Sequence, residues 1–146
     1  MIKFISTLVT AAALAHSAFG TEWLTDVSAA KEKAAKENKA IMMDFTGSDW
    51  CGYCIKLKKA VFDTPEFEKF AAEKLVLVEV DFPSKKKQPA ELKKANEKLR
   101  DQYKVEGYPT LQFIDAKGKV LGQIVGYEGE KPKEWIQKAE QIVNKK

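Results

Sequence analysis

The chain has only two cysteines, Cys51 and Cys54, and their position limits the fold more than any other feature. They follow an apolar run at 41–45 and precede a run with helical periodicity at 55–61. A thiol pair at this spacing can close a disulfide across one helical turn and open it again. At the first turn of a helix, unpaired backbone N–H groups and the helix dipole lower the pKa of a thiol. The pattern therefore predicts a thiol–disulfide exchange site at a strand-to-helix junction.

The first twenty residues predict a secretory signal peptide. Met1-Ile2-Lys3 is a short positive start, Phe4 to Ala15 is apolar, and Ala18-Phe19-Gly20 puts small residues at the positions that precede a cleavage site. The apolar run is shorter than the roughly 20 residues of a comfortable membrane span, which disfavours an uncleaved anchor. No cysteine follows the expected cut near Gly20, so we expect no lipid anchor.

Export changes what the two cysteines mean. Outside a reducing cytosol, two cysteines in one chain usually form a disulfide. We therefore expect residues 1–20 to be the signal peptide and residues 21–146 to be one periplasmic or secreted domain.

The composition fits a single globular domain of 146 residues with 45% hydrophobic and 32% charged residues. The expected signal peptide holds one lysine and the only histidine, so 24 basic and 21 acidic residues remain, a net charge of +3. Arg100 is the only arginine, and no basic stripe with interleaved aromatic residues is present. We expect no nucleic-acid partner, no cofactor and no metal, and we expect a monomer.

Strand and helix patterns alternate along the chain. A helix is predicted at 23–38, a buried strand at 40–45, a helix at 51–61 and a helix at 65–74 with Thr64 as N-cap and Pro65 at its first position. A buried strand at 75–80, a lysine-containing loop at 82–89, a helix at 90–103, two strands at 110–114 and 120–125 around a turn at 115–118, and a closing helix at 132–143 follow. This order predicts an α/β fold with a mixed central sheet and helices on both faces.

Several motifs in this order together resemble the thioredoxin superfamily. They are Asp44, Trp50-Cys51-Gly52-Tyr53-Cys54, Gly107-Tyr108-Pro109-Thr110, the turn at Asp115-Ala116-Lys117-Gly118-Lys119, and Gly126-Tyr127. The resemblance runs from about Ala40 to Val143 and looks closest to exported thioredoxin-like proteins of bacteria. It implies a thioredoxin-like fold, with a mixed sheet of about four to five strands.

The resemblance also implies roles for the matching residues. Cys51 would be the attacking thiolate, more exposed than Cys54, and Cys54 the buried resolving thiol. Asp44 would be a buried carboxylate that relays the proton of Cys54, since burial raises a carboxyl pKa toward the range of general acid–base catalysis. Pro109 would be a cis-proline lying against the disulfide. The substrate surface would comprise Trp50, Gly52, Tyr53, Tyr108 and Pro109, with Tyr108 contributing mainly its backbone.

Some positions depart from thioredoxin. Asp44 lies seven residues before Cys51, one more than in thioredoxin, so its placement can differ. Thioredoxin has a lysine near this acid, and our alignment puts Leu77 at that position. The dipeptide between the cysteines is Gly52-Tyr53, and the lysine-rich segment at 83–98 is longer than the thioredoxin connection.

Alternative interpretations apply to the same residues. A structural Cys51–Cys54 disulfide would be a poor staple, because so short a ring removes little chain entropy. A zinc site would need ligands from a dimer, and a c-type haem site would need histidine where Ile55 stands. Asp44 could be a solvent-exposed acid at a strand end. Trp50 and Tyr53 could simply pack beside the site, and Lys85-Lys86-Lys87 is most simply a solvated loop.

The resulting functional hypothesis is a thiol–disulfide oxidoreductase that acts on protein disulfides outside the cytoplasm, as reductase or isomerase. Its partners would be proteins with disulfides or thiols and a membrane redox protein that exchanges its electrons. The alternatives are a disulfide-forming oxidase and a binding or chaperone-like module whose cysteines are not turned over. Absence of histidine between the cysteines argues mildly against a strong oxidant.

Overall fold

The computed structural model describes residues 21–145, so the expected signal peptide lies outside the described residues. Its strands are β1 (Trp23–Leu24), β2 (Ala40–Thr46), β3 (Leu75–Asp81), β4 (Thr110–Ile114) and β5 (Val120–Val125). Its helices are α1 (Val27–Glu37), α2 (Gly52–Leu57), the π-helical turn η1 (Lys58–Phe62), α3 (Pro65–Lys74), α4 (Ala90–Gln102) and α5 (Pro132–Val143). No helix among residues 21–145 is both long and apolar enough to cross a membrane.

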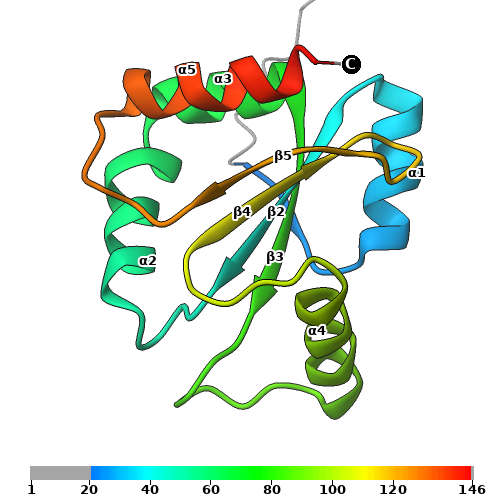
Figure 1. Cartoon of the computed structure of the whole chain (residues 1–146), viewed down its shortest axis with the longest axis vertical. Helices are drawn as coiled ribbons and strands as arrows, with labels where there is room; N and C mark the ends of the chain where they lie inside the picture. Colours follow the sequence, from blue (N-terminus) through cyan, green and yellow to red (C-terminus); the bar gives the residue numbers. More distant parts are fainter. Residues whose placement is uncertain (1–20, 146) are drawn as a thin grey trace, which may run out of the picture.

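The strands form one mixed sheet in the order β1-β3-β2-β4-β5 (Figure 1). β1 and β2 both pair with β3 in parallel, while β4 runs antiparallel to β2 and to β5. β2 is buried along its whole length and β3 nearly so, which explains why both read as continuous apolar runs. The α/β class and the five-strand mixed sheet confirm the fold predicted from the sequence.

Helices cover both faces of the sheet (Figure 1). On one face, a core around Phe67, Leu111 and Trp135 packs the sheet against α2, η1, α3 and α5. On the other face, a second core around Ala30, Phe45 and Val78 packs the sheet against α1 and α4. This two-sided packing holds the central strands β2 and β3 in place. The carboxyl ends of both strands lie on the side of the sheet where the cysteines are found.

Two expected elements differ in the structure. The helix predicted at 23–38 begins only at Val27, where Asp26 caps it and accepts hydrogen bonds from Ser28 N–H and Ala29 N–H. Trp23–Leu24 is instead a two-residue strand on the outer side of β3. The helix predicted at 51–61 changes to a π-helical turn after Leu57, and periodicity does not distinguish the two because the turn still buries Val61 and Phe62.

Candidate active site

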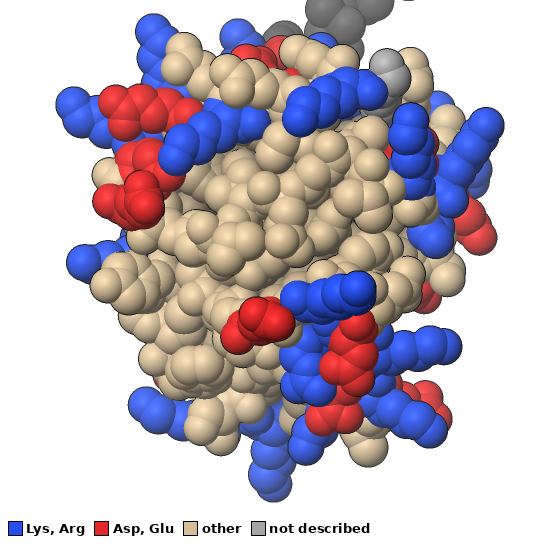
Figure 2. Space-filling view, in the orientation of Figure 1, with Lys and Arg blue, Asp and Glu red and all other residues tan. Residues whose placement is uncertain are grey.

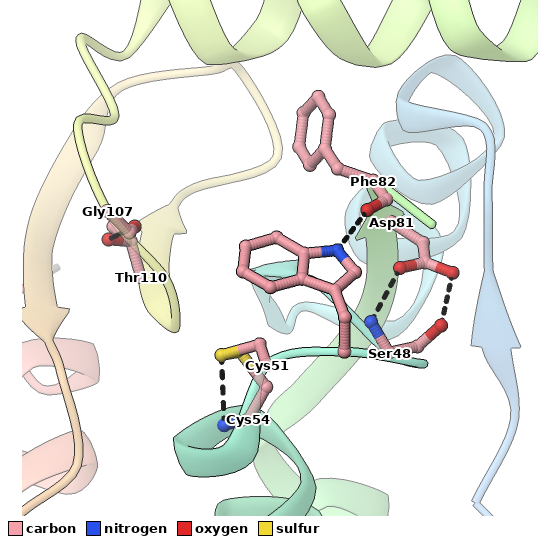
Figure 3. The surroundings of a disulfide bond; sticks show 8 residues. Ser48, Cys51, Cys54, Asp81, Phe82, Gly107 and Thr110 are labelled. Atoms are coloured by element: carbon pink, nitrogen blue, oxygen red, sulfur yellow. Dashed lines mark hydrogen bonds between the residues drawn. A yellow bond between two sulfur atoms is a disulfide. The ribbon is translucent and has the colours of Figure 1, made fainter. Parts of the chain in front are cut away.

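The two cysteines form a disulfide at the start of α2 (Figure 3). Their Cα atoms are 5.2 Å apart, and Cys51 is the N-cap residue of α2. The backbone N–H of Cys54 donates to Cys51 Sγ at 3.3 Å. Cys51 is 7% exposed and Cys54 5%, so the expected greater exposure of Cys51 amounts to little in the oxidised form. In the reduced form, the same N–H would stabilise a thiolate on Cys51.

The loop before the cysteines brings Trp50 over the end of the sheet. Gly47 allows this turn, because a Cβ at Gly47 would overlap the Trp50 indole. Trp50 Nε1 donates to the carbonyl of Phe82 at 2.8 Å, and the indole meets the Tyr108 ring edge-on at 5.9 Å between centroids. The Trp50 side chain nevertheless remains 49% exposed. Trp50 therefore packs beside the site and still leaves part of its surface available to a substrate.

Two further contacts join this loop to the segment that follows β3. Ser48 donates to the Asp81 carboxylate from its backbone N–H at 3.0 Å and from its hydroxyl at 2.6 Å (Figure 3). The Asp49 carboxylate accepts the backbone N–H groups of residues 84, 85 and 86 at 2.9, 2.8 and 2.8 Å. These donors lower the pKa of Asp49, with Ser84 N–H the strongest cause. The lysine side chains at 85–87 are exposed, as expected of a solvated loop, but its backbone is tied to the active-site loop.

We expect Asp49→Ala to release the lysine-containing loop from the active-site loop. The amides of residues 84–86 should then exchange with solvent roughly tenfold faster, because each loses its hydrogen bond to the Asp49 carboxylate. Hydrogen exchange followed by NMR measures this. Asp63→Ala is the matched control, because Asp63 is an exposed acid paired with Lys58 and does not contact this loop. Unchanged exchange at residues 84–86 in Asp49→Ala would contradict the expectation.

The loop before β4 lies on the other side of the disulfide. The Tyr108–Pro109 peptide bond is cis, as the family resemblance implies, and Pro109 is buried. The Tyr108 ring packs on Phe82 at 5.2 Å between centroids. Thr110 Oγ1 donates to the carbonyl of Gly107 at 2.7 Å (Figure 3). The Pro109 carbonyl accepts Gly126 N–H at 2.8 Å. These contacts fix the backbone on both sides of Pro109.

A groove of about 480 Å³ lies beside this loop. Tyr53, Pro109, Val125 at the end of β5 and Tyr127 line it, together with the charged residues Lys56 and Glu128. Tyr53 is 63% exposed and Val125 69%. The sequence interpretation included Tyr53 and Pro109 in the substrate surface but missed Val125, because a valine in an edge strand carries no functional signal of its own. Gly52 is exposed at the start of α2 and does not line this groove.

The groove adjoins a broad surface without charged side chains. Figure 2 shows this surface over β4 and β5, with lysines and acids gathered around its rim. The six residues of β5 include no charged residue, and Val120 at its other end is also exposed. A surface of this kind beside a redox-active disulfide suits an extended, uncharged polypeptide segment.

Asp44 lies on β2 beneath the cysteines and is buried, with 9% of its surface exposed. This excludes the solvent-exposed alternative. Asp44 and Cys54 line the same cavity of about 540 Å³. Asp44 Oδ1 has no hydrogen-bond partner among residues 21–145. Burial raises the pKa of Asp44 to about 8, and the like charges of Glu79 and Asp81 contribute further.

The neighbour of Asp44 on β3 is Glu79, which corrects our alignment of Leu77 to this position. The parallel register pairs Asp44 with Glu79 and Met42 with Leu77. A two-residue shift in register keeps the same face of the strand inward, so periodicity alone does not reveal it. The signal in the sequence was a glutamate that interrupts the apolar run before the end of the strand. Glu79 is half-buried, and burial raises its pKa as well.

The structure thus brings the expected site residues together at the carboxyl end of β2 and the start of α2. Cys51 and Cys54 form the disulfide, Trp50 precedes it and contacts Tyr108, Pro109 borders the groove, and Asp44 lines the cavity with Cys54. Among residues 21–145, no three or more His, Cys, Asp or Glu side chains are grouped so as to hold a metal ion.

Comparison with known proteins agrees with this arrangement. The family model described as a thioredoxin-like domain matches residues 27–142. Disulfide bond reductase DsbH of Chlamydia pneumoniae is 48% identical over 99 residues, which are 68% of this chain and 59% of DsbH. Thiol:disulfide interchange protein DsbD of Actinobacillus pleuropneumoniae is 31% identical over 109 residues, which are 74% of this chain and 17% of DsbD. The chain therefore spans less than two thirds of the length of each of these curated relatives.

Solved structures give the same result for the fold. The solved structure of a DsbH oxidoreductase superposes with a TM-score of 0.81 at 36% identity, covering 97% of this chain and 96% of that chain. A thioredoxin from Thermus thermophilus superposes with a TM-score of 0.62 at 17% identity, covering 85% of this chain and 88% of that chain. A family model that matches most of the chain, a cis-proline and a Cys-x-x-Cys disulfide at a helix start lead to one conclusion: the chain belongs to the thioredoxin-like family.

Proposed function

We propose that this protein is a thiol–disulfide oxidoreductase that acts on protein disulfides outside the cytoplasm, as a reductase or isomerase. The Cys51–Cys54 disulfide, placed at the start of α2 and directly above a cavity that holds Asp44, is the observation that carries the proposal. A purely structural disulfide does not need a buried, unpartnered carboxyl beside its second cysteine. The similarity to the reductase DsbH favours reduction over oxidation.

The reaction begins with the reduced protein. The Cys51 thiolate, stabilised by the Cys54 N–H, attacks one sulfur of a substrate disulfide. The new bond joins Cys51 Sγ to the substrate, and the other substrate sulfur leaves as a thiolate. Cys54 then loses its proton to ionised Asp44 and attacks Cys51 Sγ, which releases the second substrate sulfur as a thiolate. The substrate gains two electrons and the protein becomes the Cys51–Cys54 disulfide seen in the structure.

Substrate would bind across the groove beside the cysteines. Tyr53 and Val125 offer exposed apolar surface, and the Trp50 ring is half exposed above the disulfide. Rigid side chains of this kind give large contact area at low entropic cost, which suits extended peptides of varied sequence. The Tyr108 ring is held between Trp50 and Phe82, so its backbone is the part left to pair with a peptide strand.

The site of action rests on the sequence of residues 1–20. Their positive start, apolar run and small residues at Ala18 and Gly20 support export followed by cleavage. An exported reductase also needs a source of electrons, which supports a redox partner in the membrane. Secretion of a full-length chain fused to a reporter that is active only outside the cytoplasm tests this localisation.

Reduction of insulin by dithiothreitol, with the protein in catalytic amounts, tests the activity. We expect precipitation of the insulin B chain well ahead of the uncatalysed control, with repeated turnover. A binding module would give no acceleration. Equilibration of the Cys51–Cys54 pair with glutathione buffers then gives the redox potential, and a reductase should lie near thioredoxin, at about −270 mV, and far from the strong oxidants at about −120 mV.

A further inference from the structure

Two carboxyl groups lie side by side beneath the disulfide. Asp44 on β2 and Glu79 on β3 are register partners in a parallel pair of strands. Neighbouring strands are about 4.8 Å apart, and partner residues point to the same face of a sheet. Both side chains line the cavity of about 540 Å³ that also borders Cys54. Glu79 is therefore the ionisable group placed closest to Asp44 by the backbone of the sheet.

The rest of the cavity leaves Asp44 without direct compensation. Asp44 Oδ1 has no hydrogen-bond partner among the residues described. Asp44 is buried and Glu79 half-buried, so Glu79 is the one nearer to solvent. The lysines that line the cavity are Lys58 and Lys59 of η1 and Lys86 of the loop after β3. Besides Asp44 and Glu79, the titratable and charged residues that line this cavity are Cys54, Lys58, Lys59, Asp63, Glu68 and Lys86. Asp81 of β3 is a further acid close to Asp44.

We propose that Glu79 is a positioning residue of the resolving step, and that its carboxylate makes the adjacent Asp44 carboxylate a stronger base for the Cys54 proton when Cys54 attacks the mixed disulfide. This inference rests on the proposed thiol–disulfide exchange. It assigns Glu79 a role that acts through Asp44, since Glu79 itself does not contact the sulfur atoms in the structure. Two adjacent carboxylates that are buried or half-buried repel each other, so one of them retains a proton at neutral pH.

The chemistry of the step balances within this arrangement. When Asp44 is ionised it takes the proton from Cys54 Sγ, and the Cys54 thiolate attacks Cys51 Sγ. The S–S bond to the substrate breaks, the intrachain S–S bond forms, and the substrate sulfur leaves with the electron pair. Asp44 then holds the proton, and the adjacent Glu79 carboxylate disfavours its loss. The same repulsion makes Asp44 a stronger base whenever it is ionised.

A two-phase reaction with 5,5′-dithiobis(2-nitrobenzoate) separates the two chemical steps. Attack by Cys51 releases the first coloured thiolate, and resolution by Cys54 releases the second. We expect the rate of the second phase to rise with pH through a titration in the wild-type protein. In Glu79→Gln the midpoint of that rise should move to lower pH by roughly one unit, because one close like charge is removed while Asp81 remains. Glu79→Lys should move it further.

The first phase and two control variants make the test specific. Glu79→Asp keeps the charge and should keep the wild-type midpoint, and Glu68→Gln removes an exposed acid at the rim of the same cavity and should change nothing. The first phase should keep its pH dependence in every variant. If Glu79→Gln does not fold, Glu79→Lys and Glu79→Asp carry the comparison.

The outcomes distinguish this inference from the proposed function. A wild-type protein that reduces insulin, with unchanged second-phase midpoints in Glu79→Gln and Glu79→Lys, overturns the role of Glu79 and leaves the function intact. A wild-type protein that does not reduce insulin overturns the function first. A shift of the second-phase midpoint of equal size in Glu68→Gln would also overturn the inference, because any nearby negative charge, and not Glu79 in particular, would then cause the effect.

Discussion

Replacing Cys54 by serine should leave the protein covalently attached to its substrates. Cys51 would still attack, because the Cys54→Ser change keeps the backbone N–H that donates to Cys51 Sγ. The mixed disulfide would then persist, since no second thiol remains to displace the substrate. Turnover of insulin should fall to the uncatalysed rate, and disulfide-linked adducts should accumulate. Non-reducing electrophoresis shows these adducts, and reduction with dithiothreitol should separate the protein from its substrate.

The matched variant is Cys51→Ser, which also abolishes turnover but should trap nothing. Cys54 is buried in the first turn of α2 and lines the cavity but not the groove. Brief alkylation of the reduced wild-type protein followed by peptide mass spectrometry should correspondingly label Cys51 before Cys54. Equal trapping by the two serine variants would show that the order of attack is not the one assigned.

Replacing Asp44 by asparagine should make the protein more stable at pH 8 and less active. The pKa of Asp44 is raised to about 8, mainly by burial and then by the charges of Glu79 and Asp81. The folded state therefore holds a proton that the unfolded state, with an aspartate pKa of about 3.9, has already lost. Between these two values the free energy of unfolding falls as pH rises, by up to about 1.4 kcal/mol per pH unit.

Asparagine has the same shape and no charge, so it removes this penalty. We expect Asp44→Asn to gain on the order of 3 kcal/mol over wild type at pH 8, and almost nothing at pH 4, where the wild-type Asp44 is neutral in the folded state. Urea unfolding at both pH values measures the difference. The second phase of the dithiobis(nitrobenzoate) reaction should slow in the same variant and lose its dependence on the Asp44 titration, while the first phase changes little.

Asp81→Asn is an informative control because the same substitution should have the opposite sign. The Asp81 carboxylate accepts two hydrogen bonds from Ser48, at 3.0 and 2.6 Å, and an amide cannot accept both equally well. We therefore expect Asp81→Asn to be less stable than wild type. If Asp44→Asn is destabilised at pH 8, or if its advantage is the same at pH 4 and pH 8, Asp44 does not carry the buried proton.

The sequence alone identified the elements that local patterns define. The apolar runs of β2 and β3, the N-cap Thr64 of α3 and the strands of the β4–β5 hairpin follow from burial, capping and alternation within a few residues. The Cys51–Cys54 pair at the start of α2 was likewise readable, since its spacing and its neighbours are local features. The resemblance to thioredoxins then supplied the cis-proline and the acid at Asp44, which a single sequence does not prove.

Contacts between distant segments were decided only by the tertiary structure. Strand register pairs Asp44 with Glu79, because neither strand records in its own sequence which residue of its partner lies opposite. The ties from Ser48 and Asp49 to residues 81–86 join segments more than 30 residues apart. Val125 became part of the groove because β5 ends beside Pro109. The sequence thus determined which residues carry the chemistry, and the packing of the sheet determined which charges and surfaces surround them.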